Sequence, residues 1–252
     1  MHGPRTCNVG LIGRGIIASG SPAIHEAEAR ALDIALTYEI VDFDARGLHD
    51  ALLGEVVRGL AAEGWTGCNV THPFKQQVLA LCDEISPEAK ALGAVNTLSF
   101  RQGRIAGNNT DWTGFSWQIE RQIGRVSGTA VAQVGAGGAG SATAFALGRL
   151  GISELALYDP SHERCEALAQ RLRPIFPECR FLVCQSAADA ITGRQGVVQS
   201  TPVGMAAHPG MPFDPELMDE SQWLADIIYF PRETALLAAA RAKGMRAENG
   251  VG

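Results

Sequence analysis

One uncharged stretch constrains the fold more than any other feature of this sequence. Between Arg125 and Arg149 lie 23 residues without an ionisable acid or base, long enough to raise the question of a membrane-spanning helix. The stretch holds six glycines, four of them within residues 135–140. Such a cluster interrupts a helix, whereas a chain in lipid must keep its backbone paired. We therefore predict a buried strand, a glycine turn and a buried helix.

The glycines have the spacing of a dinucleotide-binding loop. Gly135, Gly137 and Gly140 satisfy Gly-x-Gly-x-x-Gly between the predicted strand and helix. In such loops the first glycine makes the turn, the second admits a pyrophosphate and the third lets helix and strand pack closely. Among 29 glycines the spacing alone is weak, but its place between strand and helix makes it specific. The residues expected to bind the cofactor here are Gly135, Ala136, Gly137, Gly138, Ala139 and Gly140.

An acidic residue follows at the distance that such a loop requires. Asp159 ends the next predicted strand, 19 residues after Gly140. Its carboxylate can accept hydrogen bonds from ribose hydroxyls and would repel a 2′-phosphate, which favours NAD over NADP. Arg164 leaves NADP open, because a guanidinium could reach that phosphate. The alternative is an aspartate that only caps the helix after Pro160.

Strands and helices alternate along the whole chain, which predicts an α/β protein with parallel sheet. Strands are expected at 8–12, 36–41, 67–70, 129–134, 155–158, 180–183, 196–199 and 224–228, with a hairpin at 96–106. Helices are expected at 23–32, 48–62, 75–82, 87–92, 110–122, 140–150, 162–172, 187–191 and 234–243. Motif placement divides the chain into residues 1–112, which would hold the substrate, and 113–252, which would hold the cofactor in a Rossmann-type domain.

Composition excludes several classes of protein. Lys and Arg number 21 against 27 Asp and Glu, giving a net charge of −6 without a basic run, which argues against nucleic-acid or anionic-membrane binding. The six cysteines include no Cys-x-x-Cys pair, so no metal site is expected. Scattered thiols and the lack of a signal-peptide pattern at the start favour the cytoplasm.

Polar residues in the first part of the chain suit a small polyol. Ser19 and Ser21 lie two apart in an expected loop, where their side chains would share one side. Thr71 and Lys75 follow the strand expected at 67–70, and Asn96 begins the hairpin.

Lys75 and Asp111 are candidates for proton transfer. Oxidation of an alcohol requires removal of its hydroxyl proton, and a desolvated lysine oriented by an aspartate can accept it near neutral pH. Spacing does not show that the two residues meet, and each could be a solvated surface charge. His72 could be an acid, a base or a packing residue, and His25 a ligand contact or a helix surface residue.

Taken together, the motifs resemble the shikimate dehydrogenase family, in particular its NAD-dependent quinate/shikimate branch. The resemblance runs from Gly10 to Gly252 and rests on these segments: Ser19-Gly20-Ser21-Pro22-Ala23-Ile24-His25, Asn69-Val70-Thr71-His72-Pro73-Phe74-Lys75, Gly93-Ala94-Val95-Asn96-Thr97, Asn109-Thr110-Asp111, the glycine loop, Ser200-Thr201-Pro202-Val203-Gly204-Met205 and Asp226-Ile227-Ile228-Tyr229.

The resemblance implies two α/β lobes with the active site in the cleft between them. It implies hydride transfer between NAD and a ring alcohol of shikimate, or of quinate, to give the 3-dehydro ketone. Lys75 and Asp111 would be the catalytic pair, and Thr201 and Met205 would lie beside the nicotinamide or ribose. The side chains implied to hold the polyol acid are Ser19, Ser21, Thr71, Asn96 and Tyr229.

Departures from the family pattern leave some points open. Tyr158-Asp159-Pro160-Ser161 replaces the Asn-Arg-Thr or Asn-Arg-Ser of NADP-using members, and Ser21 replaces a threonine that is frequent in the quinate branch, which favours shikimate. The family continues beyond Asn249-Gly250-Val251-Gly252 into a helix with a substrate-contacting glutamine, so this wall of the site is expected to be truncated, disordered or absent. A regulatory homologue that binds NAD or shikimate without turnover and an aminoshikimate dehydrogenase are the alternatives, and the molecule could be a monomer or a homodimer.

Overall fold

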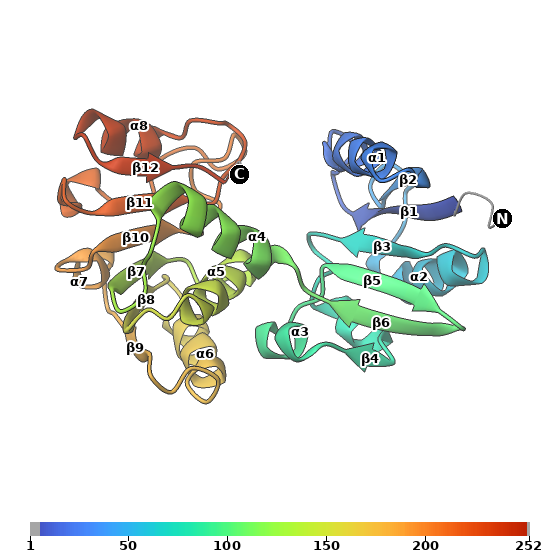
Figure 1. The fold of residues 1–252 in the computed structure, drawn as a ribbon, viewed down its shortest axis with the longest axis horizontal. Coiled ribbons are helices and arrows are strands. Elements are labelled where there is room, and N and C mark those ends of the chain that lie inside the picture. Colours follow the sequence, from blue (N-terminus) through green and yellow to red (C-terminus); the bar gives the residue numbers. More distant parts are fainter. Residues whose placement is uncertain (1–5, 251–252) are drawn as a thin grey trace. The chain divides into compact units, whose positions relative to one another are not determined.

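The computed structural model describes residues 6–250, which divide into two compact units between Thr110 and Asp111 (Figure 1). The boundary expected after Trp112 lies two residues further along the chain. The assignment of substrate and cofactor to separate domains stays a prediction. Val251 and Gly252, part of the expected final turn, lie outside the described residues.

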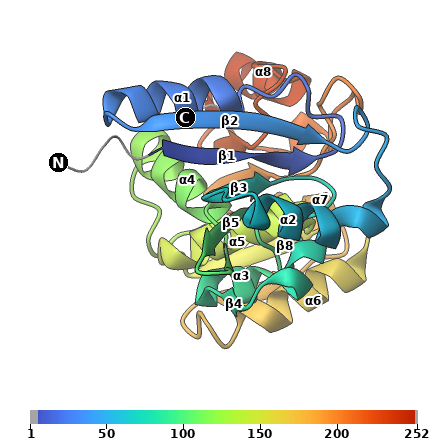
Figure 2. The same ribbon diagram turned by 90° about the vertical axis from the view of Figure 1, so that its right-hand side faces the viewer.

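The first unit is a six-stranded mixed sheet with helices. Its strands lie in the order β2-β1-β3-β5-β6-β4, with β5 antiparallel to both of its neighbours. Helix α1 packs beside β2 (Figure 2). The elements are β1 (Thr6–Gly13), α1 (Ser21–Ala31), β2 (Ala35–Asp42), η1 (Asp50–Leu52), α2 (Leu53–Ala62), β3 (Gly67–Val70), η2 (Gln77–Leu81), β4 (Glu84–Ile85), α3 (Pro87–Leu92), β5 (Thr97–Arg101) and β6 (Arg104–Asn108).

The strand pairs β1–β2, β1–β3 and β4–β6 of this unit are parallel, as predicted, and the antiparallel pairs of β5 come from the hairpin. Gln102 and Gly103 join β5 to β6 with φ values of +52° and +75°. Two residues of positive φ make a tight reversal that matches the twist of antiparallel strands, whereas parallel strands need a long crossover. The hairpin expected at 96–106 is therefore confirmed, and it makes the sheet mixed.

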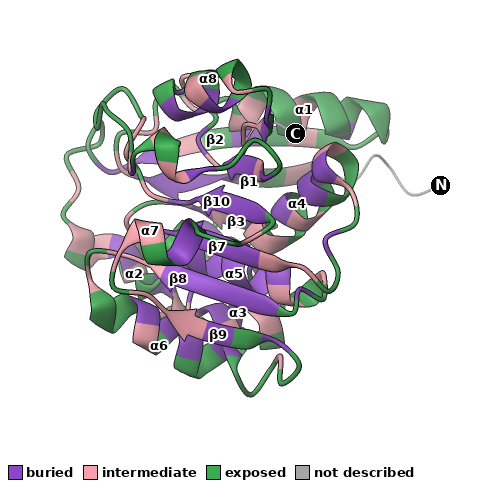
Figure 3. Ribbon diagram, turned by 90° about the vertical axis from the view of Figure 1, so that its left-hand side faces the viewer, coloured by how far each residue is buried: buried purple, intermediate pink, exposed green. Residues whose placement is uncertain are grey.

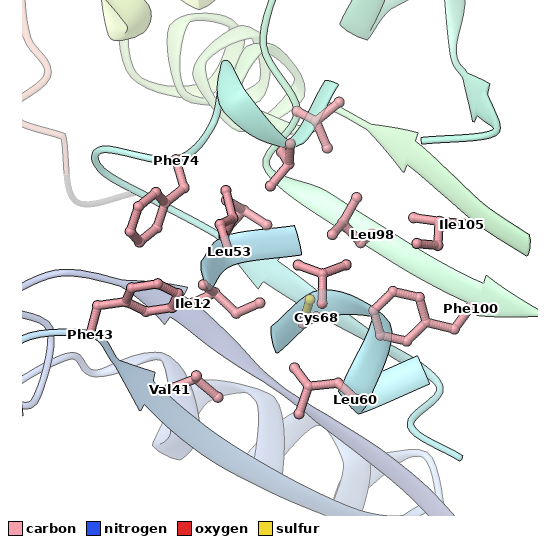
Figure 4. Packing of buried hydrophobic residues seen from close by; sticks show 14 of the residues in the cluster. Ile12, Val41, Phe43, Leu53, Leu60, Cys68, Phe74, Leu98, Phe100 and Ile105 are labelled. Carbon is pink, nitrogen blue, oxygen red and sulfur yellow. The ribbon is translucent and has the colours of Figure 1, made fainter. Parts of the chain in front are cut away.

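Apolar side chains from the sheet and from α2 form the core of the first unit (Figure 4). Val57 and Leu60 of α2 are buried with Ile12 of β1 and Val70 of β3, so the helix packs its apolar face against the sheet. Phe43 directly follows β2 in the chain, and Phe74 lies in the segment after β3. The centroids of their rings are 4.5 Å apart. This contact anchors the segment after β3, which contains the candidate residue Lys75.

The second unit is a fully parallel six-stranded sheet in the order β12-β11-β10-β7-β8-β9. β8 and β9 follow β7 on one side of the sheet, and β11 and β12 follow β10 on the other side. This is the strand order of the Rossmann fold. The elements are α4 (Asp111–Gln118), the π-helix η3 (Ile119–Ile123), β7 (Ala130–Val134), α5 (Gly138–Arg149), β8 (Glu154–Tyr158), α6 (His162–Leu172), β9 (Arg180–Val183), α7 (Ala187–Ile191), β10 (Gly196–Gln199), η4 (Pro215–Leu217), β11 (Trp223–Asp226), α8 (Ala235–Ala242) and β12 (Arg246–Glu248).

The central strands of this sheet are buried on both faces (Figure 3). Every residue of β10 is buried, and so is every residue of β7 after Ala130. Helices that cover both faces of a parallel sheet produce such continuous burial. The uncharged stretch thus forms β7 and α5, as predicted, rather than one long helix.

Differences from the expected elements lie at short or irregular segments. β4 and β12 are strands of two and three residues without an apolar alternation, so the sequence pattern misses them. The helix expected at 75–82 is a 3₁₀-helix at Gln77–Leu81, which leaves Lys75 outside it. The helix expected at 110–122 begins at Asp111 and becomes a π-helix after Gln118.

Candidate functional site

Loops that follow three neighbouring strands of the second unit surround a pocket of about 280 Å³. The strand order reverses between β7 and β10, so their carboxyl ends form the topological switch point at which open α/β sheets bind ligands. The pocket thus lies where the fold itself predicts a nucleotide. It is lined by Gly137, Gly138, Ala139, Ser200, Thr201, Pro202, Met205, Ile227, Ile228, Tyr229 and Phe230.

Each glycine of the loop meets a different spatial demand. Gly135 has a φ of +109°, a conformation that side chains disfavour. A Cβ on Gly140 would lie 2.4 Å from the carbonyl oxygen of Gly135, so only glycine lets α5 begin this close to β7. A Cβ on Gly137 would meet no atom within 4 Å, so this glycine borders open space. These three properties fit the turn, the helix packing and the pyrophosphate approach of a dinucleotide site.

Asp159 follows β8 and contacts the glycine loop directly. Its Oδ2 accepts a hydrogen bond of 2.9 Å from the backbone N–H of Ala136, and its Oδ1 accepts one of 2.9 Å from Ser161. A carboxylate oxygen has a second acceptor position, so both oxygens can still accept a ribose hydroxyl. Asp159 therefore fits an adenosine ribose and also orders the loop. Arg164 lies exposed on the first turn of α6.

The opposite wall of the pocket comes from the loops after β10 and β11. The N–H of Thr201 donates to Gln199 at 2.7 Å, and the Thr201 hydroxyl accepts from the N–H of Val203 at 3.2 Å. Met205 is 38% exposed and Tyr229 is 67% exposed, so both have free surface toward a ligand. Tyr229, for which the family resemblance implies a substrate contact, thus lies on the same wall as Thr201 and Met205.

In the first unit, Thr71, Lys75 and Asn96 come from segments that are hydrogen-bonded to each other. The N–H of Val70 donates to the Asn96 carbonyl at 2.8 Å, and the N–H of Val95 donates to the Lys75 carbonyl at 2.8 Å. The Asn96 side chain accepts from the N–H of Thr110 at 3.0 Å. The two backbone bonds join segments whose candidate residues span 25 positions of the sequence, from Thr71 to Asn96, as the prediction of a shared site requires.

The hydroxyls of Ser19 and Ser21 lie next to each other, but not in the expected extended loop, because the glycine between them is helical and Ser21 begins α1 two residues before the expected helix start. The Ser19 hydroxyl donates to that of Ser21 at 3.1 Å. Tyr38, which the sequence analysis missed, hydrogen-bonds to Ser21 and donates to Oδ1 of Asn69 at 2.9 Å. Burial raises the pKa of Tyr38 to about 12, although the Ser21 hydrogen bond lowers it in part, so the phenol stays protonated. His25 stacks on the Tyr38 ring at 4.8 Å, which gives this histidine a packing contact.

A buried carboxylate shapes the loop that leads to Ser19. Asp42 is 1% exposed and accepts hydrogen bonds from the N–H groups of Gly15, Ile16 and Ile17 at 3.1, 2.7 and 3.1 Å. It also accepts from Asp44 at 2.9 Å. Asp42 is not among the candidates named from the sequence, because an aspartate at the end of a strand has the pattern of an ordinary solvated residue.

Asp111 begins α4 and belongs to the second unit, whereas Lys75 belongs to the first. Helix α4 is held on its own unit by the Trp112 ring, 5.3 Å from that of Phe145, and by a hydrogen bond from Gln118 to the Asn249 carbonyl. The proton-transfer pair of Lys75 and Asp111 therefore stays a prediction.

Other chemistries find less support in the described residues. Burial raises the pKa of the Cys68 thiol to about 12 and those of Cys165 and Cys179 to about 11, which makes them poor nucleophiles at neutral pH. Within residues 6–250, no three His, Cys, Asp or Glu side chains are grouped so that they could hold a metal ion. None of the helices in this part of the chain is both long and apolar enough to cross a bilayer.

Comparison with known proteins agrees with this geometry. Residues 11–98 match the model of the shikimate dehydrogenase substrate binding domain. Shikimate dehydrogenase (NADP(+)) of Pseudarthrobacter chlorophenolicus is 43% identical over 239 residues, which cover 94% of this chain and 81% of that protein. Quinate/shikimate dehydrogenase (NAD(+)) of Corynebacterium efficiens is 40% identical over 245 residues, covering 96% of this chain and 86% of that protein.

Solved structures give the same result. Quinate dehydrogenase from Corynebacterium glutamicum, in complex with NAD, superposes with a TM-score of 0.89 at 38% identity and covers 98% of this chain and 88% of that one. Shikimate dehydrogenase from Aquifex aeolicus superposes with a TM-score of 0.87 at 31% identity, covering 100% of this chain and 89% of that one. With both its sheets and nearly its whole length matched, the chain belongs to the shikimate dehydrogenase family.

Proposed function

We propose that this chain is an NAD-dependent dehydrogenase that interconverts shikimate and its 3-dehydro ketone. The observation that carries the proposal is the position of Asp159, whose carboxylate lies against the glycine loop where an adenosine ribose would bind. The relatives named above include both NADP- and NAD-using enzymes, so the cofactor preference rests on this residue.

The residues of this chain divide the work of binding and proton transfer. Ser19, Ser21, Thr71 and Asn96 are hydroxyl and amide groups that would hold the substrate hydroxyls and carboxylate. Lys75 would take the proton of the reacting hydroxyl, and Asp111 would orient Lys75 and the substrate. NAD, when bound, supplies the hydride acceptor. Oxidation then removes one hydride from the carbon and one proton from the oxygen, leaving the ketone.

The proposed reaction is tested directly by the formation of NADH. We expect absorbance at 340 nm to rise with shikimate and NAD, more slowly with quinate, and more slowly with NADP than with NAD. Calorimetry with NAD alone measures binding independently of turnover. If the protein binds NAD but oxidises neither shikimate nor quinate with NAD or NADP, the proposed activity is wrong. The alternative of a homologue that binds NAD without catalysis would then be favoured.

The role of Asp159 predicts a change in cofactor preference. Asp159→Asn removes the charge that would repel a 2′-phosphate but keeps an oxygen that can accept from the Ala136 N–H. We expect the ratio of kcat/KM for NAD over NADP to fall about tenfold or more, since tenfold corresponds to only ~1.4 kcal/mol. Steady-state kinetics with both cofactors measures this ratio.

Asp219 provides a matched control for this variant. It also follows an element of the second unit and accepts a backbone hydrogen bond, from Ser221 at 2.9 Å, but it does not line the pocket. Asp219→Asn should leave the cofactor ratio unchanged. An equal ratio in Asp159→Asn and the unchanged protein would refute the selective role of Asp159.

A further inference from the structure

Two buried glutamines lie on the central strands β7 and β10 of the second unit, directly beneath the pocket. Gln133 and Gln199 are each 0% exposed, although β7 and β10 are otherwise apolar at their buried positions. In the pairing of the two strands, Gln133 lies opposite Val198 and Gln199 lies opposite Val134. Burying an amide group costs free energy unless its N–H donors and its oxygen are hydrogen-bonded. The hydrogen-bond partners of these two side chains therefore indicate what the side chains do.

Gln133 bonds to both ends of the glycine loop. Its Nε2 donates to the carbonyl oxygens of Gly135 and Gly140, each at 2.8 Å, and its Oε1 accepts from the Thr143 hydroxyl at 2.8 Å. One amide group thus fixes the separation between the first and third glycines. Because one amide bonds to both carbonyls, the end of β7 and the first turn of α5 are linked to each other through Gln133.

Gln199 repeats this arrangement in the loop on the other side of the pocket. Its Nε2 donates to the carbonyl oxygens of Thr201 and Val203, both at 3.0 Å, and its Oε1 accepts from the Thr201 N–H at 2.7 Å. Thr201 and Pro202 line the pocket. Both pocket walls beside the switch point are therefore fixed by an amide from the strand that precedes them.

We propose that Gln133 and Gln199 are positioning residues for the nucleotide, which hold the two loops in the conformation that NAD binds. The inference rests on the proposed function, since it assumes that NAD occupies this pocket. A loop that is already ordered loses less entropy when a ligand binds, so the two glutamines raise affinity without touching the ligand. Neither residue takes part in the chemical step, and their loss should act on binding rather than on kcat.

Gln222 allows the positioning role to be separated from a purely structural one. It is 5% exposed in the same unit and also makes three amide bonds: its Nε2 donates to the Ile191 and Arg194 carbonyls at 3.1 and 2.6 Å, and its Oε1 accepts from the Asp219 N–H at 2.7 Å. None of these partners lines the nucleotide pocket. Replacing any of the three glutamines by methionine removes three similar hydrogen bonds from a similar environment.

The experiment compares Gln133→Met, Gln199→Met and Gln222→Met with the unchanged protein. Titration calorimetry with NAD gives Kd well below each melting temperature, and kinetics give KM for NAD and kcat. We expect all three variants to have a lower Tm. We expect Kd and KM for NAD to rise about tenfold in Gln133→Met and Gln199→Met only, with kcat within about threefold of its original value.

Thr143→Val is a milder variant that keeps the test decisive if Gln133→Met does not fold. It removes the hydroxyl that donates to Oε1 of Gln133 and leaves the volume almost unchanged, and a rise of a few-fold in Kd is expected. Unchanged Kd in Thr143→Val and Gln199→Met, or an equal rise in Gln222→Met, would overturn the proposal. Failure of the unchanged protein to bind NAD would instead refute the proposed function.

Discussion

Replacing Lys75 by alanine should lower kcat by at least about 100-fold, because a positioned acid or base contributes roughly that much to a proton transfer. Lys75 is half-buried, and its backbone carbonyl is hydrogen-bonded to the segment that contains Asn96, a residue suited to hold a polyol. We expect NAD binding, which we propose for the pocket of the second unit, to be retained. Initial rates with saturating shikimate and NAD, together with calorimetry, measure the two effects separately.

Lys75→Arg tests whether the residue moves a proton or only supplies charge. A guanidinium stays protonated at any relevant pH, so it preserves the positive charge and cannot accept a proton. We expect this variant to be nearly as inactive as Lys75→Ala. Lys90, exposed on α3 of the same unit, is the control, and Lys90→Ala should retain full activity. Activity close to normal in Lys75→Arg would exclude proton transfer by this residue.

Asp42→Ala should reduce the free energy of unfolding by about 3 kcal/mol, because the backbone N–H groups that it bonds would lose a charged acceptor. The bonded loop leads to Ser19, so we also expect a higher KM for shikimate. Urea unfolding and steady-state kinetics measure the two effects. Asp44→Ala is the control: Asp44 is more than half exposed and its ion pair with Arg14 should be worth less than about 1 kcal/mol.

The contribution of Asp42 should also depend on pH in a defined direction. Burial alone would raise the pKa of Asp42, but the N–H groups of Ile16, Asp44, Ala45 and Gly15 together lower it below its ordinary value. A carboxyl whose pKa is lower in the folded state stabilises the fold fully above its unfolded pKa of about 3.9 and loses this effect as the pH falls through the folded value. The stability difference between the unchanged protein and Asp42→Ala should therefore be constant near neutral pH and shrink below about pH 4. A difference that grows with acid would contradict this assignment.

The glycine loop and the hairpin could be predicted because their geometry follows from local sequence. Gly135 needs a positive φ and Gly140 needs the space of a missing side chain, and both demands leave glycine at a fixed spacing. Gln102-Gly103 similarly specifies a tight reversal. In each case the residue type itself carries the backbone requirement, so no knowledge of distant contacts was needed.

The supporting residues could not be predicted, because their roles depend on distant backbone groups. Asp42 bonds to a loop about 25 positions earlier in the chain, and Tyr38 bonds to Asn69. Gln133 is a polar residue in an apolar strand, a pattern that alone does not reveal which carbonyls it meets. The proximity of Lys75 and Asp111 is also not predictable from local pattern or spacing, because the two residues belong to different units.

The close approach of Gly140 to Gly135 has a consequence for how this gene can vary. Every amino acid that a single-base change can substitute for a glycine codon carries a Cβ, and at Gly140 that atom would lie 2.4 Å from a carbonyl oxygen. Every single-base substitution that changes this residue therefore introduces a steric clash with the Gly135 carbonyl oxygen. A substitution at Gly140 thus also requires a change in the backbone path of the glycine loop.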